Sequence, residues 1–506
     1  MNELKKIHTA LISVYYKDKL NEIVKALEQL QVRILSTGGT LKYIQDCGIK
    51  AESVEELTSY PSILGGRVKT LHPKIFGGIL ARRENEDDLF QLQEYSIPEI
   101  DLVIVDLYPF EETVASGAPD QEIVEKIDIG GVSLIRAAAK NFKDVAIIAS
   151  RNQYPQLLGI LKGGTTSIDE RRELASQAFD ITTQYDIAIY QYFNKVFPPS
   201  SYKLSVKGAN SLRYGENPHQ KGVFYGNLND LFEQIHGKEI SYNNLLDIDA
   251  AVNLISEFDE PTIAILKHNN ACGLATRKDL KQAWVDALAG DPLSAFGGVI
   301  ISNRIVDLGT AEEINKLFFE VIIAPGYNSD SLPILASKKN RIILIQKINE
   351  LPNYTFKTML TGLLVQERDF STETEKDMRC VTTKTPTQDE ISDLIFANKI
   401  VKHSKSNAIV LARNQQLVAS GVGQTSRVDA LKHSLEKANG FGFDLKGAVM
   451  ASDAYFPFAD SVEVADKAGI TAIVQPGGSV KDQDSIDYCN NHNIAMVFTG
   501  KRHFKH

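Results

Sequence analysis

The chain has 506 residues, 43% of them hydrophobic and 24% charged, which is the composition of a globular protein too long for one ordinary domain. Its net charge of −9 gives no basic field that would attract nucleic acid, and no apolar run approaches the roughly 20 residues of a membrane span. Four widely spaced cysteines without a C-x-x-C pair argue against structural zinc and disulfide scaffolds, and they suit a reducing cytoplasm.

Strands and helices alternate along residues 1–197. Apolar β-prone runs predict strands at 9–14, 32–35, 102–107 and 145–149, and helical spacing predicts helices at 19–30, 40–47 and 168–196. Such alternation is typical of a parallel, doubly wound α/β sheet. A cluster of proline and serine at 197–201 ends the pattern, so we place the end of the first domain at residue 197.

The rest of the chain alternates in the same way. Apolar runs predict strands at 262–266, 298–302 and 321–324, and a second set at 408–412, 449–451 and 473–474. A polar, threonine-rich stretch at 370–388 separates the two sets. We therefore expect two further domains, at 198–370 and 371–506.

Several segments of the first domain can hold an anion. The run Ser36, Thr37, Gly38, Gly39 and Thr40 lies between a predicted strand and helix, where glycines let backbone N–H groups approach a phosphate. A plain Gly-Gly turn with a threonine N-cap is the alternative. Ser13 and Lys17, after the first strand, are placed to complete such a pocket.

The next candidate site residues of the first domain are two cations and an aromatic residue. Arg67 and Lys69, just before Thr70, would face the same side of an extended segment, although a solvated basic loop gives the same pattern. Tyr108 follows a strand and precedes a proline that stops pairing, and a core aromatic is its alternative.

The helix predicted at 133–140 is the last feature of the first domain. Asp128 comes before Gly130 and Gly131, and backbone donors at such a helix start can face a developing oxyanion, although a lone aspartate there is more often a cap. Lys140, at the far end, is where a cation favours the helix dipole.

The strand at 262–266 runs directly into Lys267 and His268, followed by Asn269, Asn270 and Gly273. A strand that ends there and turns presents a cation and a titratable imidazole where open α/β folds place chemistry. An ordinary surface pair is the alternative. The zinc-deaminase signature His-x-Glu with Pro-Cys-x-x-Cys is absent, so we expect no catalytic metal.

Three strings in order, at 66–73, 211–220 and 267–273, closely resemble the bifunctional purine-biosynthesis family that joins an AICAR transformylase to an IMP cyclohydrolase. The resemblance runs from about residue 11 to the last residues. It implies a methylglyoxal-synthase-like doubly wound sheet followed by two cytidine-deaminase-like α/β subdomains. The implied substrates are AICAR and formyl-AICAR, the product is IMP, and 10-formyltetrahydrofolate is the formyl donor.

In the first domain, the resemblance implies that Lys69, Tyr108, Asp128 and Lys140 serve cyclisation, with the anion-binding residues named above holding the substrate. The chain departs from the family at Tyr15 and Tyr16, where Ser-Asp is usual, and Lys17 keeps its place.

In the second half, the resemblance assigns proton transfer to His268, oxyanion stabilisation to Lys267 and substrate positioning to Asn407. Contacts to the phosphate, base and folate are implied for the other matching positions, which are Arg213, Tyr214, His219, Gly297, Glu320, Arg427, Asp460 and Arg502. By analogy with the family we expect a homodimer, and the cysteine usage favours the cytoplasm. One alternative is a zinc-free nucleotide-binding regulatory module fused to a deaminase-like domain, and a zinc nucleobase deaminase is another.

Overall fold

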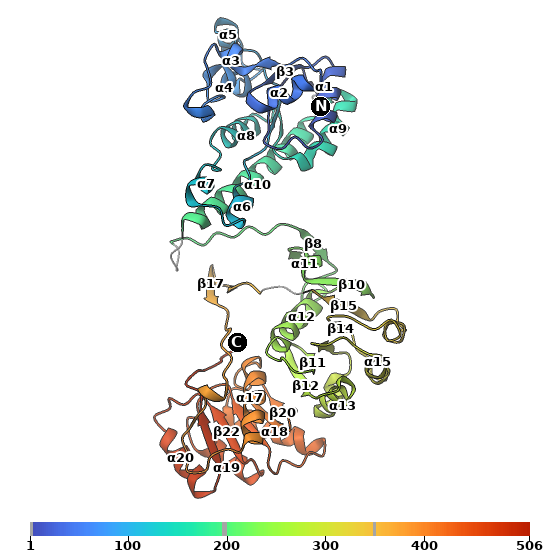
Figure 1. Cartoon of the computed structure of the whole chain (residues 1–506), viewed down its shortest axis with the longest axis vertical. Helices are drawn as coiled ribbons and strands as arrows, with labels where there is room; N and C mark the ends of the chain where they lie inside the picture. The colour runs from blue at the N-terminus through green and yellow to red at the C-terminus, as the bar shows by residue number, and fades with distance from the viewer. Residues whose placement is uncertain (1–3, 195–199, 348–350) are drawn as a thin grey trace. The chain divides into compact units, whose positions relative to one another are not determined.

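The computed structural model describes residues 4–194, 200–347 and 351–506 of the chain. These residues form two compact units, with the division between Ser205 and Val206. Figure 1 shows both units with many of their elements labelled. The proline and serine cluster that we expected to end the first domain begins in residues 195–199, which lie outside the described residues.

The first unit contains the predicted parallel sheet, with the strand order β4-β3-β2-β5-β6. Its strands are β2 (Thr9–Ser13), β3 (Arg33–Ser36), β4 (Glu52–Ser53), β5 (Leu102–Val105) and β6 (Ala146–Ile148). A two-residue pair, β1 (Lys5–Lys6) with β7 (Thr165–Thr166), lies outside this sheet. The chain adds strands on one side of β2 up to β4 and then on the other side from β5 to β6. The direction of strand order therefore reverses between β2 and β5.

The helices of the first unit connect and cover these strands. They are α1 (Leu20–Gln29), α2 (Gly38–Asp46), α3 (Val54–Thr58), α4 (Pro73–Leu80), α5 (Glu86–Glu94), α6 (Phe110–Ala115), α7 (Asp120–Val124), α8 (Gly130–Lys140), α9 (Tyr154–Gly163) and α10 (Ile168–Phe193). The sheet is buried on both faces, as the all-buried pattern of β5 shows. Helix α8 begins at Gly130, three residues before the predicted start, so both glycines belong to its first turn.

The second unit contains one mixed sheet, in which twelve strands are described. Its order is β10-β15-β14-β13-β11-β12-β20-β19-β21-β22-β23-β18. The strands are β10 (Phe232–His236), β11 (Thr262–Lys267), β12 (Asn270–Thr276), β13 (Val299–Ser302), β14 (Val321–Ala324), β15 (Ile342–Gln346), β18 (Arg379–Cys380), β19 (Ile409–Arg413), β20 (Gln416–Gly421), β21 (Val449–Ser452), β22 (Ala472–Gln475) and β23 (Ala495–Phe498).

Counted inward from either end of the sheet, the same kinds of strand follow one another in the same order, which confirms the expected pair of similar subdomains. Each half has an antiparallel hairpin (β11–β12 or β19–β20), three strands that run parallel to one another, and an outer antiparallel strand. The halves meet where Ala275 of β12 pairs with Gln416 of β20. We call residues 232–346 the first repeat and residues 379–498 the second repeat.

Helices cover the two faces of this sheet differently. On one face α12 (Tyr242–Ile255) and α17 (Gln388–Lys402) share a single apolar core with strands of both repeats. The opposite face has a separate core for each repeat. The helices on that face are α13 (Leu280–Gly290) and α15 (Leu308–Asn315) in the first repeat, and α18 (Arg427–Gly440), α19 (Asp460–Lys467) and α20 (Asp482–Asn491) in the second.

Smaller elements complete the second unit. They are α11 (Leu228–Leu231), α14 (Pro292–Ala295), α16 (Leu332–Leu335) and two separate hairpins, β8 (Ala209–Leu212) with β9 (Gly222–Tyr225) and β16 (Tyr354–Met359) with β17 (Gly362–Glu367). One sequence expectation is wrong here, because Gly273 lies inside β12 and not in the turn. A Cβ at Gly273 would come within 2.1 Å of the Ala287 carbonyl oxygen, so close approach of α13 explains that glycine.

Candidate functional sites

A cavity of about 750 Å³ opens at the carboxyl ends of β2 and β5, where the strand order reverses. This is the place where open parallel sheets bind ligands. Most of the predicted residues of the first domain line it, and they come from the strand ends, the start of α2, the 66–71 segment and the start of α8. They are Ser13, Lys17, Thr37, Gly39, Thr40, Arg67, Lys69, Thr70, Tyr108, Asp128, Gly130 and Gly131.

Three predicted residues do not line the cavity. Ser36 is buried and donates its hydroxyl to the Ile12 carbonyl at 2.8 Å, so it joins neighbouring strands. Gly38 has φ +54°, and the Lys69 Nζ lies 3.3 Å from the position that its Cβ would take. Lys140 is exposed at the last residue of α8, about 15 Å from the cavity end of that helix at 1.5 Å per residue.

Lys69 reaches the cavity between two glycines. A Cβ at Gly66 would lie 2.8 Å from the Lys69 Cε, and Gly66 has φ +92°. Gly38 and Gly66 therefore supply both the backbone conformation and the space that this side chain needs.

The segment before Lys69 is not extended as we expected. Residues Leu64–Gly66 form a short 3-10 turn, and Arg67 has helical dihedral angles of −68° and −24°. Arg67 forms an exposed ion pair with Glu125, and both side chains line the cavity. The cation therefore lies at the cavity with an acidic partner that an anionic ligand would have to replace.

A partly buried carboxylate, Asp128, and a buried one, Asp106, shape the cavity wall. Asp128 accepts the Gly131 N–H at 2.6 Å, and burial raises the pKa of its carboxyl. Asp106, which sequence reasoning missed, accepts the backbone N–H groups of Tyr15 and Tyr16 and so fixes the loop after β2. Burial also raises the pKa of Asp106.

Tyr108 lies at the cavity mouth beside an aromatic neighbour. Its ring meets Tyr15 edge-on with centroids 5.7 Å apart. Burial raises the pKa of Tyr108, and the nearby Asp128 carboxylate raises it further. The phenol is therefore a hydrogen-bond donor at neutral pH.

The Lys17 ammonium faces the end of β2. It donates to the carbonyl oxygens of Val14 and Tyr15, the second at 3.1 Å, and burial lowers its pKa. Lys17 thus lines the cavity from the strand end, as the sequence predicts.

In the second unit, Lys267 ends β11 and His268 begins the two-residue turn to β12. His268 and Asn269 have φ values of 50° and 64°, and the Asn269 N–H donates to Asp247 Oδ1 on α12 at 2.7 Å. Lys267 Nζ donates to the Phe296 carbonyl at 2.5 Å, which places it beside Gly297.

Glu320 lies near the same turn. Its Oε2 accepts Nδ2 of Asn244 at 3.1 Å and pairs with Lys238 at 3.4 Å. Asp247 lies within electrostatic range of Glu320, Lys267 and His268. The structure therefore brings together four predicted residues (Lys267, His268, Gly297 and Glu320) and adds Asp247 and Asn244 from α12.

Predicted residues of the second repeat form a neighbouring group. Arg427 Nη2 donates to Asn407 Oδ1 and to Asp453 Oδ1, both at 2.9 Å, and Asp453 is fully buried. Asn270 links this group to the first repeat, because its Nδ2 donates to the His268 carbonyl and its Oδ1 accepts the Lys405 N–H. Asp460, by contrast, accepts the N–H and the hydroxyl of the adjacent Ser461 at the start of α19.

The C-terminal segment joins the Asn407 group. The His503 N–H donates to the Asp453 carbonyl at 3.1 Å, and the Lys505 carbonyl accepts the Ser406 N–H at 3.0 Å. Arg502 precedes this anchor and stacks on Phe504 with its guanidinium 4.3 Å from the ring centroid. The predicted Arg502 is thus held near Asn407.

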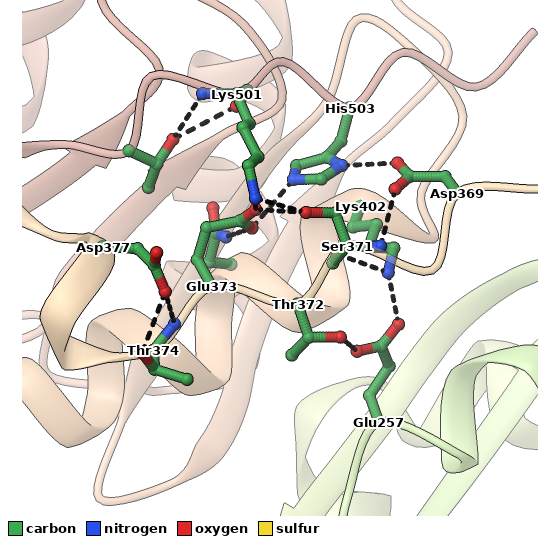
Figure 2. Close-up of polar contacts among 12 residues, drawn as sticks. Glu257, Asp369, Ser371, Thr372, Glu373, Thr374, Asp377, Lys402, Lys501 and His503 are labelled. Carbon is green, nitrogen blue, oxygen red and sulfur yellow. Dashed lines mark hydrogen bonds and ion pairs between the residues drawn. The ribbon is translucent and has the colours of Figure 1, made fainter.

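A cluster of charged side chains holds that segment, as Figure 2 shows. His503 lies between Asp369 and Glu373, at 2.6 and 2.9 Å. Although burial alone would lower it, the hydrogen bonds to these carboxylates raise the pKa of His503 to about 9. Nearby, the buried Lys402 donates to Glu257 at 2.6 Å.

Arg213, Tyr214 and His219 lie in the loop between β8 and β9, where Arg213 stacks over Tyr214. A bond from Asn243 to the Glu216 carbonyl attaches this loop to α12. Arg213 and His219 are exposed.

In the described parts of the chain, no group of three or more His, Cys, Asp or Glu side chains is arranged to hold a metal ion. None of the described helices has the length and apolar character needed to cross a membrane.

The chain is similar to known proteins over its whole length. A family model described as "AICARFT/IMPCHase bienzyme" matches residues 138–437, and a model described as "MGS-like domain" matches residues 19–133. A relative from Bacteroides thetaiotaomicron, "Bifunctional purine biosynthesis protein PurH", is 63% identical and covers 100% of both chains. Relatives of the same name from Aquifex aeolicus and Acetivibrio thermocellus are each 47% identical, over 98% and 99% of this chain and 100% of their own.

Proposed function

Since the chain belongs to the AICARFT/IMPCHase bienzyme family and has the AICAR formyltransferase and IMP cyclohydrolase activities of the last two steps of IMP synthesis, we propose which residues carry each activity. Cyclisation is assigned to residues 1–197 and formyl transfer to residues 198–370 and 371–506 together. The observation that carries the proposal is the gathering of the first motif set around one cavity and of the second set around the β11–β12 turn and the Asn407 group.

Cyclisation joins two groups of the same molecule. In formyl-AICAR, the carboxamide nitrogen attacks the formyl carbon, the formyl oxygen takes on negative charge, and water then leaves to give IMP. Because the reacting groups are already tethered, the protein mainly has to orient them and stabilise the oxyanion.

The residues of the cavity suit these tasks. The Lys69 ammonium and the N-terminal end of α8 at Gly130 supply positive charge for the oxyanion. Tyr108 donates a proton or hydrogen bond, and Asp128, whose pKa burial raises, accepts the carboxamide proton.

The substrate phosphate needs an anion site at the other side of the cavity. Arg67, Lys17 and the start of α2, with Ser13, Thr37, Gly39, Thr40 and Thr70 alongside, form it in this proposal. Ser36 and Gly38 do not line that site, and they hold the neighbouring backbone and leave space for Lys69. The resemblance implies a role in cyclisation for Lys140. This residue lies away from the cavity, so its role stays a prediction.

Formyl transfer needs a proton acceptor, because the AICAR amine is a poor nucleophile. His268 takes the amine proton as the nitrogen attacks the formyl carbon, and Lys267 stabilises the oxyanion. The bond from the formyl carbon to N10 of the folate breaks and N10 takes up a proton, so the products are formyl-AICAR and tetrahydrofolate. The formyl donor is proposed to be 10-formyltetrahydrofolate, used as a substrate.

The remaining predicted residues position the two substrates. Asn407, fixed by Arg427, orients the formyl or carboxamide group, and the other positions hold the phosphate, base and folate. These are Arg213, Tyr214, His219, Gly297, Glu320, Asp460 and Arg502. No metal is part of either mechanism as proposed.

The test is to assay purified protein for both activities, with AICAR plus 10-formyltetrahydrofolate and with formyl-AICAR alone. Separate loss of the two activities on mutation of the two sites supports the assignment, and joint loss in a folded variant contradicts it. The alternative of a regulatory module is not favoured, since relatives that match the whole chain are bifunctional enzymes.

We also infer a cytoplasmic homodimer that binds these small molecules and no nucleic acid or membrane. The family resemblance and the net charge of −9 support this. Sedimentation velocity on the active protein tests the dimer, and a fully active monomer contradicts it.

A further inference from the structure

The turn that carries His268 depends on a carboxylate from another element. Asp247, on α12, is partly buried and accepts the Asn269 N–H at Oδ1, 2.7 Å away. The charged groups facing Asp247 are Lys267 and His268 from the end of β11 and its turn, and Glu320 before β14. Burial raises the pKa of Asp247, while the Asn269 N–H, His268 and Lys267 oppose that shift.

The second repeat has an equivalent turn that an aspartate holds by its backbone N–H groups, but this turn carries no histidine. Asn414 and Gln415 form the β19–β20 turn with φ values of 52° and 51°. Asp393, on α17, accepts both of their N–H groups, at 2.7 and 2.6 Å. Neither turn residue there can accept a proton near neutral pH.

The two aspartates differ in how their oxygens are used. Asp393 commits both oxygens to the backbone of its turn, whereas Asp247 commits Oδ1 alone. Within the described residues no hydrogen bond to Asp247 Oδ2 is found. One oxygen of Asp247 is therefore left to act on the side chains around the turn.

We propose that Asp247 is a positioning residue for formyl transfer, whose Oδ1 fixes the His268 turn and whose negative charge stabilises the imidazolium that His268 becomes on taking the amine proton. This inference rests on the proposed role of His268. Its physical basis is that of a carboxylate that orients a catalytic histidine and stabilises its charged form.

The experiment compares Asp247→Asn, Asp247→Ala and the matched control Asp393→Asn in the full chain. Asp247→Asn keeps an oxygen that can accept the Asn269 N–H and removes only the charge. Each sample is assayed for formyl transfer, for cyclisation of supplied formyl-AICAR and for Tm. Cyclisation by the first unit of the same sample controls for protein concentration, and Tm reports the folding of the unit that carries the mutated residue.

We expect Asp247→Asn to lower kcat for formyl transfer about 10- to 100-fold, part of the contribution of a general base, with KM for AICAR within about twofold. Its Tm and cyclisation should stay near wild type. Asp247→Ala should lose more formyl transfer and also lower Tm. Asp393→Asn should lower Tm and leave kcat for formyl transfer unchanged.

A wild-type kcat in Asp247→Asn overturns the inference, and so does an equal loss of formyl transfer in Asp393→Asn. His268→Ala separates this failure from failure of the proposed function. If His268→Ala is inactive while Asp247→Asn is fully active, only the role of Asp247 is wrong. If His268→Ala keeps formyl transfer, the assigned mechanism is wrong and the inference falls with it.

Discussion

The two candidate sites are built in different ways. In the first unit, residues from several loops surround one cavity at the switch point of a single sheet. In the second, the groups come from two copies of a repeat and a C-terminal segment, joined by Asn270 and Asp453. The difference fits the proposed reactions. An intramolecular ring closure needs one enclosing pocket, whereas a transfer between two substrates needs a site that both substrates can reach.

The strongest test of whether the two sites are separate is to remove the reacting side chains of one of them. Lys267→Ala or His268→Ala should abolish formyl transfer and leave cyclisation of supplied formyl-AICAR unchanged, because each site has its own reacting groups. Parallel assays of both reactions on each variant measure this. Equal loss of both activities in a well-folded variant would show that the sites are not separate.

Within the cavity, Lys69→Ala should lower kcat for cyclisation by about 10²–10³, the usual cost of one preorganised oxyanion donor. Formyl transfer by the same sample is the control. An effect on KM alone would mean that Lys69 binds the phosphate, and the oxyanion would then need another donor.

Arg67→Ala should raise KM for formyl-AICAR about tenfold or more, with a smaller change in kcat, since a charged hydrogen bond to the phosphate is lost. Glu125→Gln is the matched variant, because it frees Arg67 from its ion pair. Its KM should fall below wild type. A KM increase in both variants would contradict competition between Glu125 and the phosphate.

The smallest effect concerns the charge cluster around His503. Its folded pKa of about 9 lies above the ordinary value of 6.5, so protonation stabilises the fold fully below pH 6.5, and this stabilisation is lost as the pH rises through 9. We expect about 1 kcal/mol, because the partner Asp369 is half exposed and screened. Thermal unfolding of the second unit at pH 7 and pH 10 measures it.

His503→Gln is the control for that measurement. This variant should be less stable than wild type at pH 7 and should lose this part of the decline between pH 7 and pH 10. A decline of the same size in both proteins would assign the pH dependence to other groups.

Much of the fold follows from local sequence. The apolar runs at β2, β5, β11 and β19 are buried strands, and Ser167 starts α10 with the capping box that its sequence encodes. The repeat was not visible in the residues, because equivalent positions differ in identity. His268 and Asn269 occupy the place of Asn414 and Gln415, and only backbone conformation relates them.

The site residues divide in the same way. Lys69 and Asp128, which their own sequence neighbours mark as candidates, both line the cavity, and their roles there stay predictions. Asp106 and Asp247 could not be predicted, since they act by accepting backbone N–H groups from segments distant in sequence. The extended conformation expected at Arg67 is wrong because Leu64, Gly65 and Gly66 all have positive φ, which the Leu does not signal.

The shared core on one face of the second unit has a consequence for cooperativity. Phe258 of the first repeat and Phe396 of the second pack edge-on with ring centroids 5.6 Å apart, inside an apolar cluster that draws on α12 and α17 alike. Neither half can bury that surface without the other, so residues 206–506 should melt in a single calorimetric transition. The expected boundary near residue 370 then separates two copies of a topology, and not two segments that fold independently.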